Sequence, residues 1–177
     1  SAQLPLIPLI EARQIDLDDI IIDSKSGMTG AGRAAKEEML FSEVSEGIHA
    51  YGVAKHRHAP EIEQGLSKAA GRPILVNFTP HLMPMNRGIL SSIYVRFANG
   101  ATAADLRATL EKKYAGEAFV RVVPEGVSPA TRHVRGSNHV LIGVFADRVP
   151  GRAIVLCVED NLVKGDRKST RLNSSHR

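Results

Sequence analysis

The most restrictive feature of this sequence is a succession of short apolar runs between residues 73 and 158 that only one long helical segment interrupts. Each run has the length and the β-branched content of a strand. The helical segment begins with the capping-box pattern Thr102-Ala103-Ala104-Asp105 and continues with Leu106 and Leu110. Because helices and strands do not alternate, we expect no doubly wound parallel sheet. The sequence predicts an α+β domain: a mixed, largely antiparallel sheet with helices on one face. The expected strands here are Pro73–Phe78, Gly88–Phe97, Phe119–Val123, His139–Phe145 and Ala153–Val158.

Residues 1–70 add two helices and one strand. Helical spacing of apolar residues predicts a helix over Ser1–Gln14, although Pro5 and Pro8 weaken the pattern. A β-branched run predicts a buried strand at Asp19–Asp23. The second helix is expected over Pro60–Ala70, where a proline and two glutamates suit a first helical turn. Loops are expected at Ser26–Arg33, which is rich in glycine, and at Gly47–His58.

Composition limits the class of protein. The chain has 177 residues, of which 43% are hydrophobic and 24% charged, as in soluble globular proteins. We expect no membrane association, because no apolar run reaches the roughly 18 residues that a span needs. We also expect no signal peptide, because no basic segment precedes the first apolar stretch. Cys157 is the only cysteine, so no intrachain disulfide can form and a reducing cytoplasm is expected. Its apolar run predicts an inert core thiol.

The basic excess lies in the last twelve residues. Residues 166–177 hold four of the 23 lysines and arginines but one of the 19 acidic residues, so residues 1–165 are nearly balanced. No basic stripe with interleaved aromatic residues remains, and we expect no nucleic-acid partner. The tail has no apolar periodicity and resembles a translated sequencing adapter. We therefore expect a single domain at 1–165 and a disordered, non-native tail at 166–177.

The segment from Ala54 to Ile62 carries the most informative motif, because it holds His56 and His58 just before a predicted helix. If the backbone is extended there, the two imidazoles point the same way. Such a pair can act as general acid and base near neutral pH. Two alternatives stay open: a pair of surface histidines, and a metal site, which needs a third ligand that no spacing in the sequence supplies.

Three further loops could contact a ligand. The glycine-rich loop can bring backbone N–H groups close to an anion, but it matches neither a Walker loop nor a dinucleotide fingerprint. Residues 80–89 are expected to form a structural turn, in which His81 and Arg87 could face a carboxylate or phosphate. The third loop, Asp160–Gly165, is also an ordinary turn pattern, although Asn161 could bond an amide.

Taken in order, the loops and the chain's first residues resemble the N-acetyl-gamma-glutamyl-phosphate reductase family over residues 1–165. Any one motif is weak, but six in order with matching spacing are specific. They are Ser1–Leu9, Ser24–Arg33, Ala50–Ile62, Pro80–Ile89, Gly136–Asn138 and Asp160–Gly165.

The resemblance implies a fold like the C-terminal domain of glyceraldehyde-3-phosphate dehydrogenase, with an open sheet face that makes contacts in a homo-oligomer. It also implies NADPH-dependent reduction of a small acyl phosphate to a semialdehyde in arginine biosynthesis. In that chemistry a cysteine thiolate displaces phosphate and NADP(H) carries the hydride. The family's cysteine, in an Asn-Pro-Gly-Cys-Tyr-Pro-Thr motif before the segment matching Ser1, is absent here. So is the N-terminal domain that holds most of the NADP(H).

By resemblance, His56 and His58 are the catalytic residues, with neither assigned to a particular role. Ser26, Gly27 and Glu61 match positions near the substrate, and Asn161 matches a position near the nicotinamide amide. Arg87 stays unassigned. Two other functions remain open: a related amino-adipyl phosphate reductase of lysine biosynthesis, and a dimerisation module without chemistry. The isolated chain is expected to be inactive.

Overall fold

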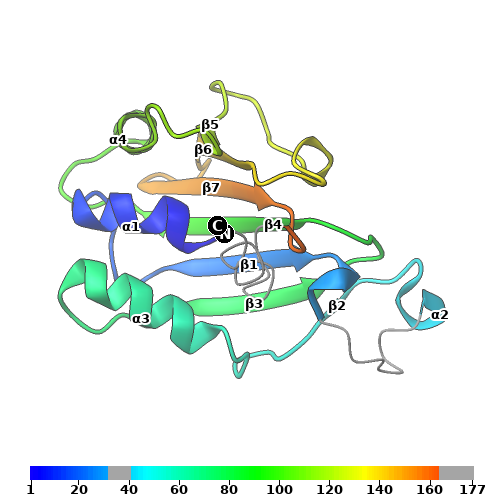
Figure 1. The fold of residues 1–177 in the computed structure, drawn as a ribbon. Coiled ribbons are helices and arrows are strands. Elements are labelled where there is room, and N and C mark those ends of the chain that lie inside the picture. The colour runs from blue at the N-terminus through cyan, green and yellow to red at the C-terminus, as the bar shows by residue number, and fades with distance from the viewer. Residues whose placement is uncertain (32–40, 164–177) are drawn as a thin grey trace, which may run out of the picture.

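The computed structural model describes residues 1–31 and 41–163, in which one sheet is covered by helices (Figure 1). The predicted tail at 166–177, together with Gly32 and Arg33 of the glycine-rich loop, lies outside the described residues. The helices are α1 (Gln3–Glu11), α2 (Phe41–Val44), α3 (Ala59–Ala70) and α4 (Ala103–Lys113), with short 3-10 turns at Met28–Ala31 and Thr131–His133. The strands are β1 (Ile21–Ser26), β2 (His49–Ala50), β3 (Asn77–Leu82), β4 (Ile89–Arg96), β5 (Val120–Val122), β6 (Val140–Ala146) and β7 (Arg152–Glu159).

Within the described residues the sheet has seven strands in the order β2-β3-β1-β4-β7-β6-β5. The β1–β3 and β5–β6 pairs are parallel, and the other four neighbouring pairs are antiparallel. Helices α1, α3 and α4 lie over one face (Figure 1). The predicted α+β class, with a mixed and largely antiparallel sheet, is therefore confirmed.

The core forms between this helical layer and one face of the sheet. Successive side chains of a strand point to opposite faces, and in β1 buried residues alternate with half-buried ones. The odd-numbered residues of β4 and β7 point toward this core, and Ile93, Ala153 and Val155 among them are fully buried in it. Cys157 belongs to the same row and is buried, as predicted. Even-numbered residues of these two strands face away from the helices, and we call that side the open face.

Helix α1 accommodates a proline because a side chain replaces the missing backbone donor. Pro8 lies inside the helix and has no N–H for the carbonyl of Leu4, four residues earlier. The hydroxyl of Tyr114, which follows α4, donates to that carbonyl at 2.7 Å. Tertiary structure thus offsets a local helix-breaking signal and ties α1 to α4.

The predicted bounds of the strand at residues 73–78 are wrong, and β1 covers Ile21–Ser26 rather than the expected Asp19–Asp23. Residues 73–76 are not in a strand, and β3 instead covers Asn77–Leu82, which includes part of the expected 80–89 turn. The N–H groups of Asn77 and Met83 donate to carbonyls of the β1 side, so the nitrogen of Pro80 faces the opposite edge. There the partner strand β2 has only two residues. Pro80 therefore removes no bond from the β1–β3 ladder.

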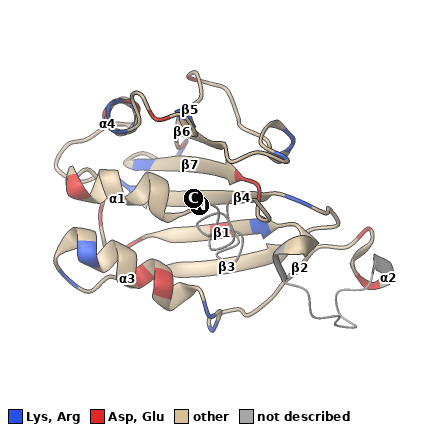
Figure 2. Cartoon of the chain, viewed as in Figure 1, with Lys and Arg blue, Asp and Glu red and all other residues tan. Residues whose placement is uncertain are grey.

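Local signals placed the other elements well. Thr102 and Asp105 form the expected capping box of α4, in which each backbone N–H donates to the other residue's side chain. In α3 the acidic residues lie in the first half and Lys68 in the last turn, which complements the helix dipole (Figure 2). No helix among the described residues has the length and apolar character to cross a membrane.

Candidate functional site

The two histidines lie in a tight turn between β2 and α3. Gly52 and Ala54 both adopt left-handed backbone conformations, with φ of 58° each, and the N–H of Lys55 donates to the carbonyl of Gly52. A left-handed conformation costs a non-glycine residue about 1–2 kcal/mol. Strain of this kind persists only where the surrounding structure enforces it. In this turn the bond from the Lys55 N–H to the Gly52 carbonyl accompanies the left-handed conformation of the exposed Ala54.

The ring of His56 is half-buried among other rings. Its centroid lies 5.2 Å from Tyr51, 4.9 Å from His58 and 5.3 Å from Phe78, each in a nearly perpendicular arrangement. Gly52 closes a further side, since a Cβ there would lie 3.0 Å from His56 Cδ2. Burial lowers the pKa of His56, and the nearby charges of His58 and Arg57 lower this pKa further. His56 is thus a neutral imidazole at neutral pH.

His58 is exposed and occupies the N-cap position of α3. Its backbone is helical, with φ of −86° and ψ of −13°, so the extended conformation considered from the sequence is not adopted. A turn brings the two rings together instead, because the N–H of His58 donates to Nδ1 of His56 at 3.2 Å. Among the residues the structure describes, no three His, Cys, Asp or Glu side chains are grouped to hold a metal ion.

Glu61 lies one helical turn after His58, in the first turn of α3. Its carbonyl accepts a hydrogen bond from Nε2 of Gln3 at 2.8 Å. Gly65 allows this approach, because a Cβ there would lie 2.3 Å from Nε2 of Gln3. The N-terminal turns of α1 and α3 are therefore linked beside the histidines.

Ser26 and Gly27 form part of a second cluster, at the end of β1. Ser26 is buried, and its Oγ donates to the carbonyl of Gly27. A Cβ on Gly27 would lie 2.9 Å from backbone atoms of Asn86 and Arg87. Gly27 is therefore required for close contact between two backbone segments, independently of any ligand.

Asn161 joins the loops of this cluster. Its Oδ1 accepts from the N–H of Gly88 at 2.8 Å, and its Nδ2 lies within hydrogen-bonding distance of the Gly27 carbonyl and of Thr29 Oγ1. Because Asn161 is 4% exposed and both amide hydrogens have protein acceptors, it serves here as a clamp between loops.

Asp160 is a residue that sequence reasoning missed. Its carboxylate is buried and accepts from the N–H groups of Gly136, Leu162 and Val163. Arg87, left unassigned from the sequence, has its Nε 3.6 Å from this carboxylate. Burial raises the pKa of Asp160, but the three backbone donors and the Arg87 charge outweigh it and leave the pKa lowered. No local pattern distinguishes this aspartate from an ordinary turn residue.

The two clusters are separate, but both lie near the N-terminal end of α1. His56 packs on Phe78, whereas Ser26 is aligned with Leu82, four residues further along β3. That separation is about 13 Å along the strand. Ser24 lies midway, aligned with Pro80. Hydroxyl groups of Ser1 and Ser24 each lie 2.8 Å from Ser91 Oγ, so the start of the chain reaches the space between the clusters.

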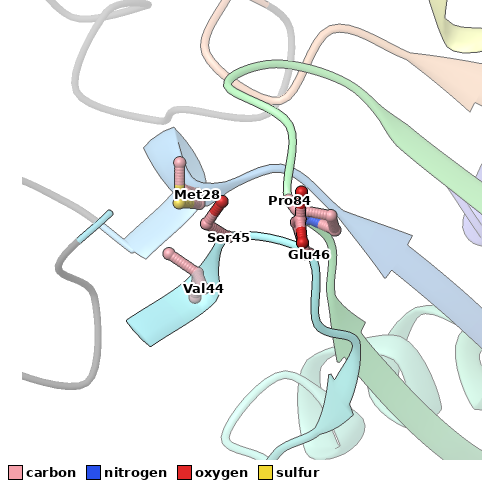
Figure 3. A pocket seen from close by; sticks show the side chains of 5 residues that line it. All are labelled: Met28, Val44, Ser45, Glu46 and Pro84. Carbon is pink, nitrogen blue, oxygen red and sulfur yellow. The ribbon is translucent and has the colours of Figure 1, made fainter. Parts of the chain in front are cut away.

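An open pocket lies beside the second cluster and is lined by Met28, Val44, Ser45, Glu46 and Pro84 (Figure 3). Its lining is mostly apolar with one acidic residue, and it contains none of the six site residues expected from the sequence. This pocket does not favour an acyl phosphate, because the charge of Glu46 repels an anion.

Solved structures define the class of fold. Aspartate semialdehyde dehydrogenase II from Vibrio cholerae aligns with 95% of this chain and 56% of its own, with a TM-score of 0.73 and 18% identity. The enzyme from Francisella tularensis gives a TM-score of 0.74 at 13% identity, covering 98% of this chain and 61% of the other. The fold is thus that of a domain found in semialdehyde dehydrogenases.

Sequence relatives give the particular family. A family profile described as "Semialdehyde dehydrogenase, dimerisation domain" matches residues 1–161, and the chain belongs to this family. N-acetyl-gamma-glutamyl-phosphate reductase of Rhodospirillum rubrum is 74% identical over 165 residues, and that of Afipia carboxidovorans 65% over 164. A probable chloroplastic reductase of the same name from Arabidopsis thaliana is 58% identical. The resemblance expected from the six motifs is confirmed. These alignments cover 93% of the chain but only 47%, 47% and 41% of the relatives, so the chain spans about half their length.

Proposed function

We propose that this chain is the catalytic and dimerisation domain of an N-acetyl-gamma-glutamyl-phosphate reductase. The whole enzyme reduces N-acetyl-glutamyl 5-phosphate to the 5-semialdehyde with release of phosphate, in arginine biosynthesis. The observation that carries the proposal is the pair of imidazoles, 4.9 Å apart, in the turn before α3 of a semialdehyde dehydrogenase fold. The relatives of that name, up to 74% identical, support this substrate over the amino-adipyl analogue. A cytoplasmic location is proposed from the single, buried Cys157.

The geometry supports different roles for the two histidines. His58 is exposed at the start of α3, where its ring can exchange protons with substrate and solvent. We assign it to proton transfer: it takes the proton of the attacking thiol, gives it to the oxyanion of the thiohemiacetal, and passes it back to the departing sulfur as the aldehyde forms. His56 is more buried and its pKa is lowered, which suits a neutral hydrogen-bond donor to the substrate. Glu61 lies one turn away and is proposed to contact the substrate.

The attacking cysteine and most of the cofactor site are assigned to the preceding half of the longer enzyme. When bound there, NADPH would supply the hydride. Both amide hydrogens of Asn161 have acceptors within the described residues, so the expected contact with the nicotinamide amide would have to replace one of these bonds. We therefore propose that Asn161, Ser26 and Gly27 act by shaping the loops beside the reaction site, and we assign no step through the cofactor.

Kinetics of the longer enzyme test this proposal. NADPH oxidation with N-acetyl-glutamyl phosphate is measured for the wild type and for His58→Asn and His56→Asn. Loss of proton transfer typically costs about 10²–10⁴-fold in rate, so His58→Asn should lower kcat by roughly two decades or more. His56→Asn should act mainly on KM, if its contact is equal in ground and transition states. Residues 1–177 alone should show no turnover.

The exposed His49 provides a matched control, and His49→Asn should leave both constants unchanged. Thermal melts of all three variants check that folding is preserved. Near wild-type kcat/KM in both site variants, or turnover by residues 1–177 alone, would refute the proposal.

A further inference from the structure

Tyr51 and Phe78 form two sides of the space that His56 occupies, although neither carries a role in the proposed reaction. Tyr51 follows β2, and Phe78 lies in β3, on the face that the helices cover. Both present their rings nearly perpendicular to the imidazole, with interplanar angles of 72° and 68°. Edge-to-face arrangements at this separation are attractive and have a defined geometry. The two rings therefore restrict how the imidazole can tilt or turn.

A hydrogen bond selects the position of the His56 proton. Nδ1 accepts from the backbone N–H of His58, so a neutral ring must carry its proton on Nε2. If the imidazole turned over, its Cδ2–H would face the His58 N–H in place of Nδ1, and the hydrogen bond would be lost. If Nδ1 were protonated, its N–H would face the His58 N–H, and the two donors would repel each other. The adjoining N-terminus of α3 carries a partial positive charge and opposes protonation as well.

The charged and titratable groups around His56 act in the same direction. Arg57 and His58 lie on the same turn, and both lower the pKa of His56. Burial raises the pKa of Tyr51, so its phenol stays uncharged at neutral pH and provides no anion that would favour an imidazolium. Phe78 is apolar. None of these neighbours stabilises a protonated His56.

We propose that Tyr51 and Phe78 are positioning residues which, together with the His58 N–H, hold His56 in the single tautomer that carries its proton on Nε2. This extends the proposed function, since a fixed Nε2–H is a ready hydrogen-bond donor to a substrate oxygen. We assign the positioning to the aromatic ring of Tyr51 and not to its hydroxyl group. Phenylalanine at position 51 should therefore position His56 equally well. Gly52 is needed for the same reason, because a side chain there would displace the imidazole.

Nuclear magnetic resonance of ¹⁵N-labelled residues 1–177 tests the inference without any enzyme assay. Long-range ¹H–¹⁵N spectra across pH 5–9 distinguish a protonated from a bare ring nitrogen, and His56→Gln identifies the His56 signals. We expect a bare Nδ1 and a protonated Nε2, with a titration midpoint below the ordinary histidine value of 6.5. A His56 that carries its proton on Nδ1, or whose titration midpoint is not below 6.5, overturns the proposal.

Variants then test the two rings. Tyr51→Phe should leave the His56 signals unchanged, whereas Tyr51→Leu and Phe78→Leu should shift the two nitrogen signals towards each other and raise the titration midpoint. Phe119→Leu is a matched control, because Phe119 packs against His139 at 5.6 Å, a separate aromatic–histidine pair. Unchanged His56 signals in Tyr51→Leu and Phe78→Leu refute the positioning role. If neither variant folds, the wild-type spectrum tests the proposal by showing which ring nitrogen of His56 carries the proton.

In the longer enzyme, Tyr51→Leu should lower kcat/KM while Tyr51→Phe retains it. If the spectra behave as expected but His56→Asn and His58→Asn keep full activity, then the proposed function fails and the positioning stands.

Discussion

Several single residues in this chain hold neighbouring loop segments together. Gly27 lets two backbones touch, and its N–H donates to the carbonyl of Gly88 at 2.8 Å. Asn161 then clamps the same segments with its amide. Asp160 binds three backbone N–H groups beside them. Gly27 and Asn161 were expected near ligands, yet the bonds observed for all three residues lie within the protein.

Replacing Gly27 by alanine should destabilise the domain. The new methyl group would lie 2.9 Å from backbone atoms that cannot rotate away, and overpacking of this kind costs about 1–3 kcal/mol. Urea unfolding measures the free-energy difference. Gly47→Ala is the matched control, because its nearest atom is 4.0 Å away and its φ is not positive. Equal stability of the two variants would contradict the close approach.

The lowered pKa of Asp160 predicts a dependence of stability on pH. An aspartate whose pKa is lower in the folded state stabilises the fold above its unfolded value of 3.8, and this contribution is lost as the pH falls through the folded-state pKa. The stability difference between wild type and Asp160→Asn should thus be larger at pH 6 and shrink below about pH 4. Urea unfolding across this range measures it, with the exposed Asp18→Asn as control. A difference that stays constant with pH would contradict the role of Asp160.

Cys157 should not react with thiol reagents in the native protein. It is fully buried, and burial raises the pKa of its thiol to about 12, so almost no thiolate forms at neutral pH. Labelling by a chromogenic disulfide at pH 8 should be slow in buffer and fast in denaturant. Rapid labelling of the folded chain would show that this strand is accessible.

At the scale of elements, the fold depends on contacts that compensate for unfavourable local sequence. α1 contains Pro8, and the carbonyl that this proline leaves unpaired is bonded by Tyr114. β3 contains Pro80, whose nitrogen faces the edge where β2 is short. Each proline is accommodated by a neighbouring element rather than by its own segment.

Tyr114→Phe should cost about 1–2 kcal/mol, because it removes the only donor shown for the carbonyl of Leu4 among the described residues. Pro8→Ala restores a backbone N–H that can donate to this carbonyl. The same Tyr114→Phe change should therefore cost less when Pro8→Ala is present. A double-mutant cycle by thermal or urea unfolding measures the coupling. Fully additive effects would show that the Tyr114 hydroxyl does not replace the missing donor.

At the scale of the whole molecule, the sheet has one covered face and one open face. The open face carries half-buried apolar side chains on its central strands, among them Leu90, Tyr94, Ile154 and Leu156. An apolar area of this kind is typical of an interaction surface. The chain belongs to a dimerisation-domain family, and we propose that the open face forms the contact between subunits.

Leu156→Asp should therefore weaken self-association, because it places a charge in the centre of the proposed contact. Light scattering after size-exclusion chromatography measures the mass of residues 1–177 and of the variant over a range of concentrations. Leu75 is 79% exposed in the segment before β3, and Leu75→Asp should leave the mass unchanged. An unchanged mass for Leu156→Asp would place the contact elsewhere.

Local sequence determined the class of the fold and most elements. The capping box of α4 arises from interactions within a few residues, and the structure has it. The residues of β3 could not be placed by composition alone, because their pairing with β1 selects Asn77–Leu82 over the apolar run before it. The family resemblance rests on the order of the motifs, so the sequence alone was sufficient to find it.

Tertiary structure alone decided how the candidate site is arranged. The sequence put His56 and His58 close together, but the turn that joins them and the rings of Tyr51 and Phe78 around them depend on strand pairing. Residues 51 and 78 are far apart in the chain, and no local pattern records their contact. Asn161 and Asp160 meet Gly88 and Gly136 for the same reason. Short-range hydrogen bonds and periodicity depend on residues that are close in the sequence. Contacts between distant segments form only once the strands have paired into the sheet.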